Sequence, residues 1–411
     1  MRRIYTCIDI GTDSIKAVTI EDYNEKCNVL ASAKVKSKGV KQGLIVDASS
    51  VSQAIKKAVK QLESKLGTKV DKVIAVVPSN NMETTVTIGK TNINHLDNII
   101  TGDDIFSCLQ NSLKDKVSKD MEVVCVSPIE YKINKNKKVK NPLGLEGQTL
   151  EVKAVITTVP KKNVYSVVSV LKNLNIEVMD IIISAIADYY ATKTKELDER
   201  AVGLINIGVE KTNISIFNKG ILVEENILPI GSANIDSDIS FTYKTDLEES
   251  KKIKEEFAVS NRKYADSDES YDCTNRLGEK VSINQYKLSE LIETRIIDLL
   301  QNAQNELNNL TNHEIGYIII TGGVTSMLGF NAIVEELFPR NAMVINIGIL
   351  GIRDNVYSSA YGAIKYFIEK LNLREKEYTM FDEEKVNEIL STRKKVGSNG
   401  VLSKIFGKIF D

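Results

Sequence analysis

The chain alternates short apolar runs with helical patterns. Residues 4–10 and 16–20 are apolar runs separated by a polar turn at residues 11–14, which predicts the two strands of a hairpin. Residues 47–66 repeat apolar positions at the spacing of a helix with one buried face. Residues 73–77 are another apolar strand, which a proline ends. Strands and helices in this order indicate an α/β fold.

The opening pattern recurs in the middle of the chain. Residues 201–207 are an apolar strand, Gly208 begins a polar turn, and residues 213–217 return as a strand. A third turn, at residues 321–323, follows the apolar run 318–320. Two such units predict an internally duplicated α/β protein with a cleft between its halves. Further helices are expected at residues 162–173, 185–195, 246–257, 287–310 and 360–371, with a strand at 178–183.

Three segments interrupt the α/β pattern. Residues 82–158 change to short strands and polar turns, with one helix at 103–116 and a loop at 134–147, which predicts an inserted subdomain. Residues 265–278 are polar and are expected to form a loop. Residues 374–400 lose apolar periodicity and are predicted to be a flexible tether.

Composition and charge narrow the function classes. The formal net charge of -1 argues against a broad electrostatic surface for nucleic acid. The five cysteines have no CxxC spacing and the two histidines stand alone, so we expect neither a zinc site nor a disulfide framework. No apolar run approaches the ~18 residues of a spanning helix. Asp9 interrupts the one N-terminal stretch that resembles a signal peptide, so we expect a cytoplasmic protein.

The first turn has the chemistry of a phosphate-binding loop. A phosphate needs backbone N–H donors on a concave turn and small residues that let the main chain approach. Gly11 permits the tight turn, and Thr12 and Ser14 add hydroxyl donors. Lys16 is placed to reach the β- or γ-phosphate, and Asp9 to hold Mg²⁺ through water. An ordinary hairpin is the alternative for this motif alone, and the absence of GxxxxGK[ST] disfavours a P-loop fold.

The third turn strengthens the nucleotide hypothesis. Thr321, Gly322 and Gly323 follow an apolar strand and offer a backbone surface against which a nucleoside can lie, although a plain turn is the alternative. The chain contains Asp-x-Gly-Thr at residues 9–12, a second strand–turn unit and Thr-Gly-Gly. The occurrence of all three in one chain is much less expected by chance than that of any one of them. This order and spacing resemble the actin/Hsp70/sugar-kinase superfamily.

Within that superfamily the chain resembles the FtsA family of bacterial cell-division proteins over nearly its whole length. The Asn-Pro-x-Gly-x-x-Gly run at residues 141–147 is the most family-specific motif, because general actin relatives do not carry it. The stretches that carry the resemblance are residues 9–12, 127–131, 140–147 and 319–323 and the amphipathic C-terminal end.

The resemblance implies an α/β, actin-like, two-lobed ATPase fold with an FtsA-type inserted subdomain. It implies a first lobe at residues 1–83, 162–199 and 351–373, an inserted subdomain at 84–161, a second lobe at 200–240 and 316–350 with a subdomain at 241–315, a flexible linker at 374–399, and an amphipathic membrane-targeting helix at 400–411.

The resemblance also implies that ATP and Mg²⁺ bind between the lobes, with adenosine between Gly322-Gly323 and the helix at 246–257. Glu249 and Lys252 lie i, i+3 on that helix and share a face that could contact ribose and base, although a solvated Glu–Lys pair is the alternative. The residues expected to bind nucleotide are Asp9, Gly11, Thr12, Asp13, Ser14, Lys16, Gly208, Thr212, Glu249, Lys252, Gly322, Gly323 and Val324, with Asp9 also holding the metal.

The mid-chain turn departs from the family pattern. Relatives often have Asp-x-Gly-Gly-Gly-Thr there, whereas this chain has Asn206-Ile-Gly-Val-Glu-Lys-Thr. Asn206 cannot act as a general base or as a charge partner for Mg²⁺. Val209 and Glu210 replace small residues, and Glu210 adds a negative charge near the phosphates. We therefore expect slow or no ATP hydrolysis and assign no catalytic residue.

The last eleven residues have the pattern of an interfacial helix. On a helical wheel one half is apolar and the other half carries the lysines, so that apolar side chains would enter the acyl boundary and lysines meet anionic headgroups. A helix packed on its own domain or in a partner groove is the alternative. One copy should bind weakly and a polymer avidly. The membrane candidates are Val401, Leu402, Lys404, Ile405, Phe406, Lys408, Ile409 and Phe410.

Two function classes remain open. The favoured one is a scaffold that polymerises on the cytoplasmic face of the cell membrane, as a peripheral protein at the division site, with anionic lipids and other division proteins as further partners. The resemblance implies that residues 241–315 bind the tail peptide of FtsZ, through Arg295 and more weakly through Lys287 and Asn284. The alternative is a small-molecule phosphotransferase or a chaperone-like ATPase, and Asn206 supplies no carboxylate for the phosphotransfer.

Overall fold

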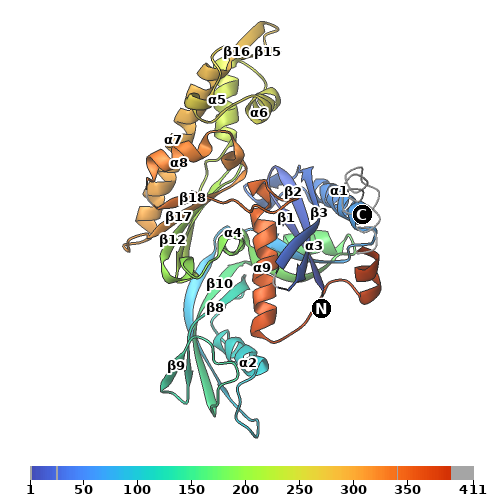
Figure 1. Ribbon diagram of the computed structural model, residues 1–411, viewed down its shortest axis with the longest axis vertical. Helices are drawn as coiled ribbons and strands as arrows, with labels where there is room; N and C mark the ends of the chain where they lie inside the picture. The colour runs from blue at the N-terminus through green and yellow to red at the C-terminus, as the bar shows by residue number, and fades with distance from the viewer. Residues whose placement is uncertain (1, 25, 340, 390–411) are drawn as a thin grey trace, which may run out of the picture.

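Two five-stranded sheets with the same strand order form the centres of two lobes (Figure 1). The computed structural model describes residues 2–24, 26–339 and 341–389. The first sheet contains β1 (Arg3–Ile10), β2 (Ser14–Tyr23), β3 (Lys26–Lys36), β6 (Lys72–Val77) and β11 (Glu177–Ile183). The second contains β12 (Ala201–Ile207), β13 (Thr212–Asn218), β14 (Ile221–Leu228), β17 (Tyr317–Thr321) and β18 (Ala342–Val344).

The two sheets are topological copies of each other. The order β3-β2-β1-β6-β11 in the first lobe matches β14-β13-β12-β17-β18 in the second. In both, the first three strands pair antiparallel and the remaining two join in parallel. The predicted internal duplication is therefore confirmed.

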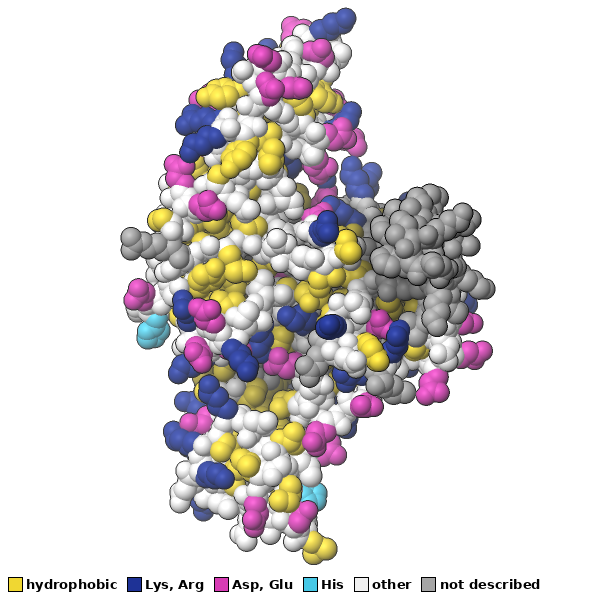
Figure 2. Space-filling view, viewed as in Figure 1, with side chains coloured by type: hydrophobic (Ala, Val, Ile, Leu, Met, Phe, Trp, Pro, Cys, Tyr) yellow, Lys and Arg dark blue, Asp and Glu magenta, His cyan; other side chains and the backbone are white. Residues whose placement is uncertain are grey.

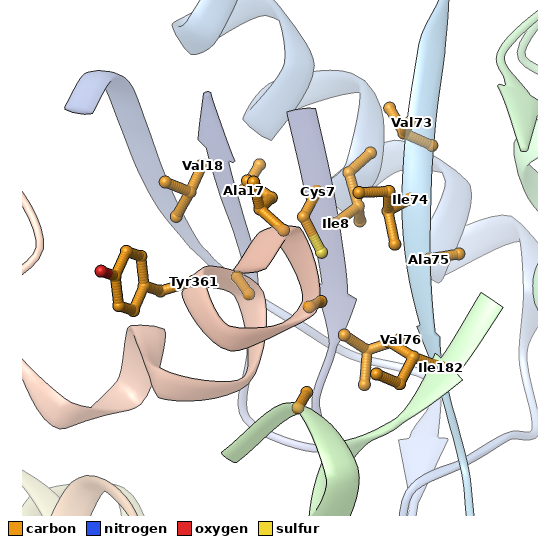
Figure 3. Packing of buried hydrophobic residues seen from close by; sticks show 14 of the residues in the cluster. Cys7, Ile8, Ala17, Val18, Val73, Ile74, Ala75, Val76, Ile182 and Tyr361 are labelled. Carbon is orange, nitrogen blue, oxygen red and sulfur yellow. The ribbon is translucent and has the colours of Figure 1, made fainter. Parts of the chain in front are cut away.

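Helices cover both faces of the first-lobe sheet (Figure 1). The helix α1 (Ala48–Leu66) and the helix α3 (Lys161–Lys172) pack on one side, and α9 (Ser358–Leu373) crosses α4 (Ser184–Thr192) on the other. The Asp47 side chain accepts hydrogen bonds from the backbone N–H groups of Ser49 and Ser50 and so caps α1. Side chains of β1, β2 and β6 form the core with α9, including Cys7, Ile8, Ala17, Ile74 and Tyr361 (Figure 3).

The inserted subdomain has a sheet and a core of its own. The strands β7 (Glu83–Asn92), β8 (Met121–Ile133), β9 (Lys137–Val139) and β10 (Thr149–Pro160) are ordered β7-β10-β8-β9. Helix α2 (Gly102–Ser112) packs on β7 and β10, over a core that contains Tyr131, Ile133 and Leu150. The segment predicted as a loop at residues 134–147 contains the short strand β9.

The second lobe carries a subdomain of helices and one hairpin. Its elements are α5 (Ala233–Tyr243), α6 (Leu247–Glu256), β15 (Ser270–Thr274), β16 (Lys280–Asn284), α7 (Gln285–Leu310) and α8 (Phe330–Leu337). The loop predicted at residues 265–278 is corrected at residues 270–274, which form β15 and pair antiparallel with β16. Tyr271 and Cys273 alternate with polar residues and pack on the subdomain core, a period of two that the polar composition hides.

The C-terminal segment corrects the predicted tether over residues 374–389. The Met380 N–H donates to the Ile4 carbonyl at 3.0 Å, and the Tyr5 hydroxyl donates to the Tyr378 carbonyl at 2.8 Å. Met380, Phe381 and Ile389 are buried against the first lobe. These apolar residues are too widely spaced to show a period, yet strand β1 and its neighbours cover them. The predicted amphipathic helix at residues 400–411 lies outside the described residues.

Short elements complete the described chain: β4 (Val40–Lys41), β5 (Leu44–Ile45), η1 (Leu197–Glu199), η2 (Arg262–Tyr264), η3 (Gly323–Ser326) and η4 (Asn355–Tyr357). None of the helices in the described part of the chain has the length and hydropathy needed to span a bilayer.

Candidate nucleotide-binding cleft

The two lobes meet around a cleft of about 530 Å³, a volume typical of sites for small ligands. Three turns line it: the β1–β2 turn of the first lobe, and the β12–β13 turn and the turn after β17 of the second. Ten of the predicted nucleotide-binding residues come together here: Asp9, Gly11, Thr12, Asp13, Ser14, Lys16, Gly208, Gly322, Gly323 and Val324.

The turns of the two lobes have the same hydrogen-bond geometry. The Gly11 N–H donates to the Ser14 carbonyl at 3.1 Å, and the Gly208 N–H donates to the Lys211 carbonyl at 2.9 Å. Both turns therefore span four residues at the end of the first strand of a hairpin. Because the flanking strands pair in the same register, each position of one turn has a counterpart in the other.

The corresponding positions differ in charge. In the first lobe Asp9 and Lys16 are cross-strand neighbours, and the Lys16 ammonium lies 2.9 Å from an Asp9 carboxylate oxygen. In the second lobe the equivalent neighbours are the amides Asn206 and Asn213. A Cβ atom at Gly11 would lie 2.9 Å from the Ser14 carbonyl oxygen, so the tightly closed backbone of this turn requires glycine there. One side of the cleft thus has an ion pair where the other has neutral amides.

Asp188 lies behind the cleft wall and supports three residues that line it, a role that the sequence reasoning missed. It lies on α4, completely buried, and accepts hydrogen bonds from the Asn206 amide at 2.6 Å and from the Ser358 and Ser359 hydroxyls at 2.7 and 2.8 Å. Burial raises the pKa of Asp188 to about 6, with a smaller contribution from the charge of Asp9, while the three hydrogen bonds oppose the shift. The available signal was one carboxylate within an otherwise apolar helix.

The turn after β17 requires glycine at its first position. Gly322 has φ 115° and ψ 162°, and a Cβ atom there would lie 2.1 Å from the Ile207 carbonyl oxygen. The backbone of this turn therefore approaches the end of β12 closely. Apolar side chains continue the surface from this turn along the cleft, namely Val324, Met327, Leu328, Ala258 and Val356. A flat apolar group such as a base fits such a surface.

Glu249 and Lys252, which were expected to contact adenosine, lie beside Tyr271. Neither lines the cleft. Glu249 accepts a hydrogen bond from the Tyr271 hydroxyl at 2.8 Å, and the Lys252 ammonium lies 5.9 Å from the centre of the Tyr271 ring. The i, i+3 spacing predicted a shared face but could not say which way that face points. Lys251, Lys254 and Glu255 line the cleft instead.

Thr212 is also placed away from the cleft. Its side chain is buried and its hydroxyl donates to the Ile230 carbonyl at 2.8 Å. The residue thereby fixes the start of β13 to the segment before α5. This hydrogen bond gives Thr212 a role in supporting the turn.

Two lysines of α6 form ion pairs at the cleft. Lys254 lies 2.6 Å from Asp236, with both side chains largely buried, and it also donates to the Ser232 carbonyl at 3.2 Å. Lys251 pairs with Asp13, which joins the second lobe to the β1–β2 turn of the first. Burial opposes the charge of Lys251, but the hydrogen bond and charge of Asp13 outweigh it and raise the pKa of Lys251.

Two residues of the second turn also contact the first lobe. Glu210 accepts a hydrogen bond from the Gln42 backbone N–H at 2.5 Å, and Lys211 donates to the Asn80 side-chain oxygen at 2.9 Å. Burial lowers the pKa of Lys211. Glu210 does line the cleft, yet its carboxylate is engaged by the opposite lobe.

The predicted partner residues lie on and before α7, in the second-lobe subdomain. Arg295 is partly exposed and donates two hydrogen bonds to the Asp238 carboxylate, at 2.5 and 3.0 Å. Lys287 is exposed. Asn284 caps α7: it accepts from the Lys287 N–H at 3.1 Å and donates to the Ser267 carbonyl at 2.7 Å. Asn284 therefore has a structural role as the cap of α7, and its contact with a partner stays a prediction.

Sequence comparison decides the family. A family model described as Cell division protein FtsA matches residues 203–362, and one described as SHS2 domain inserted in FTSA matches residues 75–158. The chain belongs to the FtsA family. It is 26% identical to the FtsA of Bacillus subtilis (strain 168) over 365 residues, which cover 88% of this chain and 83% of the relative. It is 24% identical to the FtsA of Enterococcus faecalis (strain ATCC 700802 / V583) over 366 residues, with 88% and 83% covered.

Solved structures share the fold of this FtsA-family chain. A chain of the PilM-PilN type IV pilus biogenesis complex has a TM-score of 0.57 at 11% identity and covers 90% of this chain and 99% of its own length. MreB5 of Spiroplasma citri bound to ADP has a TM-score of 0.55 at 11% identity, with 91% and 99% covered. The predicted fold, actin-like with an FtsA-type insert, is confirmed. The chain is an actin-like protein of cell division.

Proposed function

We propose that this protein is an ATP-binding scaffold that polymerises on the cytoplasmic face of the cell membrane and tethers the FtsZ ring during cell division, with slow or no ATP hydrolysis. The observation that carries the proposal is the cleft. Two turns of the same geometry line it from opposite lobes, and a third turn adds an apolar surface. The ADP bound to the structurally similar MreB5 supports a nucleotide as the ligand.

The cleft residues fit a nucleotide phosphate chain. Gly11, Thr12 and Ser14 supply backbone and hydroxyl donors on the first turn, and Lys16 supplies a positive charge beside them. Asp9 is the carboxylate suited to hold Mg²⁺, an ion that needs only one or two protein carboxylates because it keeps waters and phosphate oxygens. We assign adenosine to the surface formed by Gly322, Gly323 and Val324. Lys251, Lys254 and Glu255 of α6 take the place of the pair first expected there.

Slow or absent hydrolysis rests on the second turn. Asn206 occupies the position equivalent to Asp9 and brings no negative charge to the phosphates. Its amide is held by Asp188, whose buried carboxylate faces Asn206 and two serines. The carboxylate that the second turn does contain, Glu210, accepts a hydrogen bond from the Gln42 N–H of the opposite lobe, so it is not free to take a proton from an attacking water. The nucleotide then acts as a ligand that joins the lobes.

Attachment to anionic lipids rests on the sequence of residues 401–411, which separates six apolar side chains from two lysines on a helical wheel. Recruitment of FtsZ rests on Arg295, whose guanidinium is held in a defined orientation by Asp238 at the surface of the second-lobe subdomain. Self-assembly and contacts with other division proteins follow from the family and are part of the proposal.

One experiment tests membrane, polymer and partner together. The full chain is applied to lipid monolayers containing phosphatidylglycerol, with and without ATP and FtsZ, and is viewed by electron microscopy. We expect ordered polymers on the lipid that recruit FtsZ filaments, and none with a variant that lacks residues 401–411. Equal coverage by the truncated chain would remove the membrane claim, and a bare layer with the full chain and ATP would refute the scaffold.

A further inference from the structure

Helices α1 and α3 form an unusually basic layer on the first lobe. Together they contain seven lysines and a single acidic residue, Glu63, in a chain whose net charge is -1. The two helices contact each other and cover one face of the first-lobe sheet (Figure 1). The lysines are Lys56, Lys57, Lys60, Lys65, Lys161, Lys162 and Lys172.

Most of this positive charge is exposed and unneutralised. The exposed stripe of α1 consists of lysine, glutamine and serine side chains, and the exposed stripe of α3 is equally free of acidic residues. Glu63 is partly buried and accepts a hydrogen bond from the Val70 N–H, so it is turned away from the stripe. We define the lysine face as the exposed lysines of α1 and α3 that form neither an ion pair nor a side-chain hydrogen bond within the described part of the chain, namely Lys56, Lys57, Lys60, Lys162 and Lys172. Lys65 is not included because it donates to the Ser32 carbonyl at 2.5 Å.

The side of the molecule that carries α9 is different. There, acidic and basic side chains are interspersed over the surface (Figure 2). Lysines of this region are paired, as Lys370 with Asp180 at 2.6 Å and Lys193 with Glu369 at 2.7 Å. The excess of lysine is therefore a local property of the α1–α3 layer, and it produces a local positive potential that the net charge conceals.

The C-terminal segment leads the chain to the same layer. Lys385 forms an ion pair at 2.9 Å with Asp71, in the loop that directly follows α1. Residues 383–389 are helical and Ile389 is buried on the first lobe, so the described chain ends beside this layer. The sequence then continues with the basic run Arg393-Lys394-Lys395, before the apolar and lysine positions of residues 401–411.

We propose that the lysine face is a second membrane-contact surface, which binds anionic lipid headgroups beside the C-terminal tail. The inference rests on the proposed membrane attachment and adds a site on the folded body. A lysine near an anionic bilayer raises the partition to the membrane by about fivefold at moderate salt, so three such residues supply a large part of a weak attachment. The face also sets an orientation: α1 and α3 lie against the lipid, and Arg295 belongs to the other lobe.

Vesicle sedimentation of the full chain tests the site. The variant K56Q/K57Q/K60Q removes three charges of the lysine face, and K135Q/K137Q/K140Q removes three exposed charges of the inserted subdomain as the matched control. Glutamine keeps nearly the same helix propensity as lysine, and unchanged far-ultraviolet circular dichroism checks the fold. Vesicles are equal parts phosphatidylglycerol and phosphatidylcholine, or phosphatidylcholine alone, and a chain without residues 401–411 is run in parallel.

We expect K56Q/K57Q/K60Q to lose at least tenfold in partition to the anionic vesicles, while the control loses less than threefold. The difference should disappear at about 0.5 M salt, where exposed charges are screened. Equal partition of the two triple variants overturns the lysine face and leaves the tail proposal standing. Binding that survives removal of residues 401–411 but not K56Q/K57Q/K60Q overturns the tail and supports the face. Absence of binding by the full chain overturns both.

Discussion

The Asn206–Asp188 contact makes the second turn open to a direct test. Replacing Asn206 with aspartate supplies the carboxylate that the family pattern has at this position. The same change removes the amide that donates to Asp188 at 2.6 Å and puts a second carboxylate in its place. The structure therefore predicts a stability effect that depends on pH.

Two energies decide the size of that effect. If both carboxylates stayed ionised 2.6 Å apart, their repulsion would be about 6 kcal/mol at an effective dielectric constant of about 20. Taking up one proton costs much less, because the pKa of Asp188 is already raised to about 6 by burial. Protonating such a group at pH 7 costs about 1.4 kcal/mol, and at pH 5 almost nothing. The pair should therefore share a proton.

We expect Asn206→Asp to lower the free energy of unfolding by about 1–2 kcal/mol at pH 7 and by less than about 0.5 kcal/mol at pH 5. Urea unfolding followed by circular dichroism at both pH values measures it. The exchanged variant D188N/N206D restores one amide and one carboxylate, so it should recover most of the loss. The shared proton would be refuted if Asn206→Asp lowered the free energy of unfolding equally at both pH values. It would also be refuted if the exchanged variant lost as much stability as the two single changes added together.

Three further predictions follow from the same region and from the partner surface. The pKa of Asp188 rises from 3.8 to about 6 on folding, so its contribution to stability is full below about pH 4 and is lost as the pH rises through about 6. The free energy of unfolding should therefore fall by up to about 3 kcal/mol over this pH range. Asp188→Asn should remove that fall, as measured by urea unfolding. Gly322→Ala places Cβ 2.1 Å from the Ile207 oxygen at a positive φ, a strain of about 1–3 kcal/mol or more, and should weaken binding of a fluorescent ATP analogue at least tenfold. Arg295→Glu puts a carboxylate beside Asp238 and should reduce pull-down of an FtsZ tail peptide at least fivefold.

Each of these has a control that leaves the fold in place. Gly316→Ala adds a methyl whose nearest neighbour is 3.5 Å away, so it should leave ATP-analogue binding unchanged, and an equal loss in both glycine variants would contradict the argument from Gly322. Asp238→Asn keeps the arginine charge and should retain the peptide, whereas unchanged binding by Arg295→Glu removes that residue from the interface. A pH profile of Asp188→Asn parallel to the wild type would show that another group titrates.

Much of the fold could be predicted from the sequence because the patterns that indicate it are local. The apolar strand, polar turn and apolar strand at residues 4–20 and 201–217 reflect the burial of β1, β2, β12 and β13, and the periodicity of α1 reflects its packing on the sheet. The hairpin β15–β16 was missed because its alternation is masked by polar residues. The docking of residues 374–389 was missed because it depends on the partner strand β1, which lies more than 360 residues away in the chain.

The site could be predicted only in part, because only its local features leave a pattern in the sequence. The turns of β1 and β17 have sequence signatures, since backbone approach to a ligand requires glycine. The orientation of α6 has no sequence signature. Lys251 and Lys254 face the cleft because the tertiary packing buries Ile253 and Ser250 beneath the helix. Asp188 enters the site only because α4 and α9 cross, which brings it to two serines distant in sequence.

The hydrogen bonds that join residues 378–380 to Ile4 and Tyr5 have a mechanical consequence. Any tension on the chain beyond residue 389 is passed through this contact to β1, which runs for eight residues, about 26 Å, and ends at the turn that begins with Gly11. Traction on the tail therefore pulls along the strand that ends in the β1–β2 turn of the cleft. Force on the tail and a ligand in the cleft would thus act on the same strand from opposite ends.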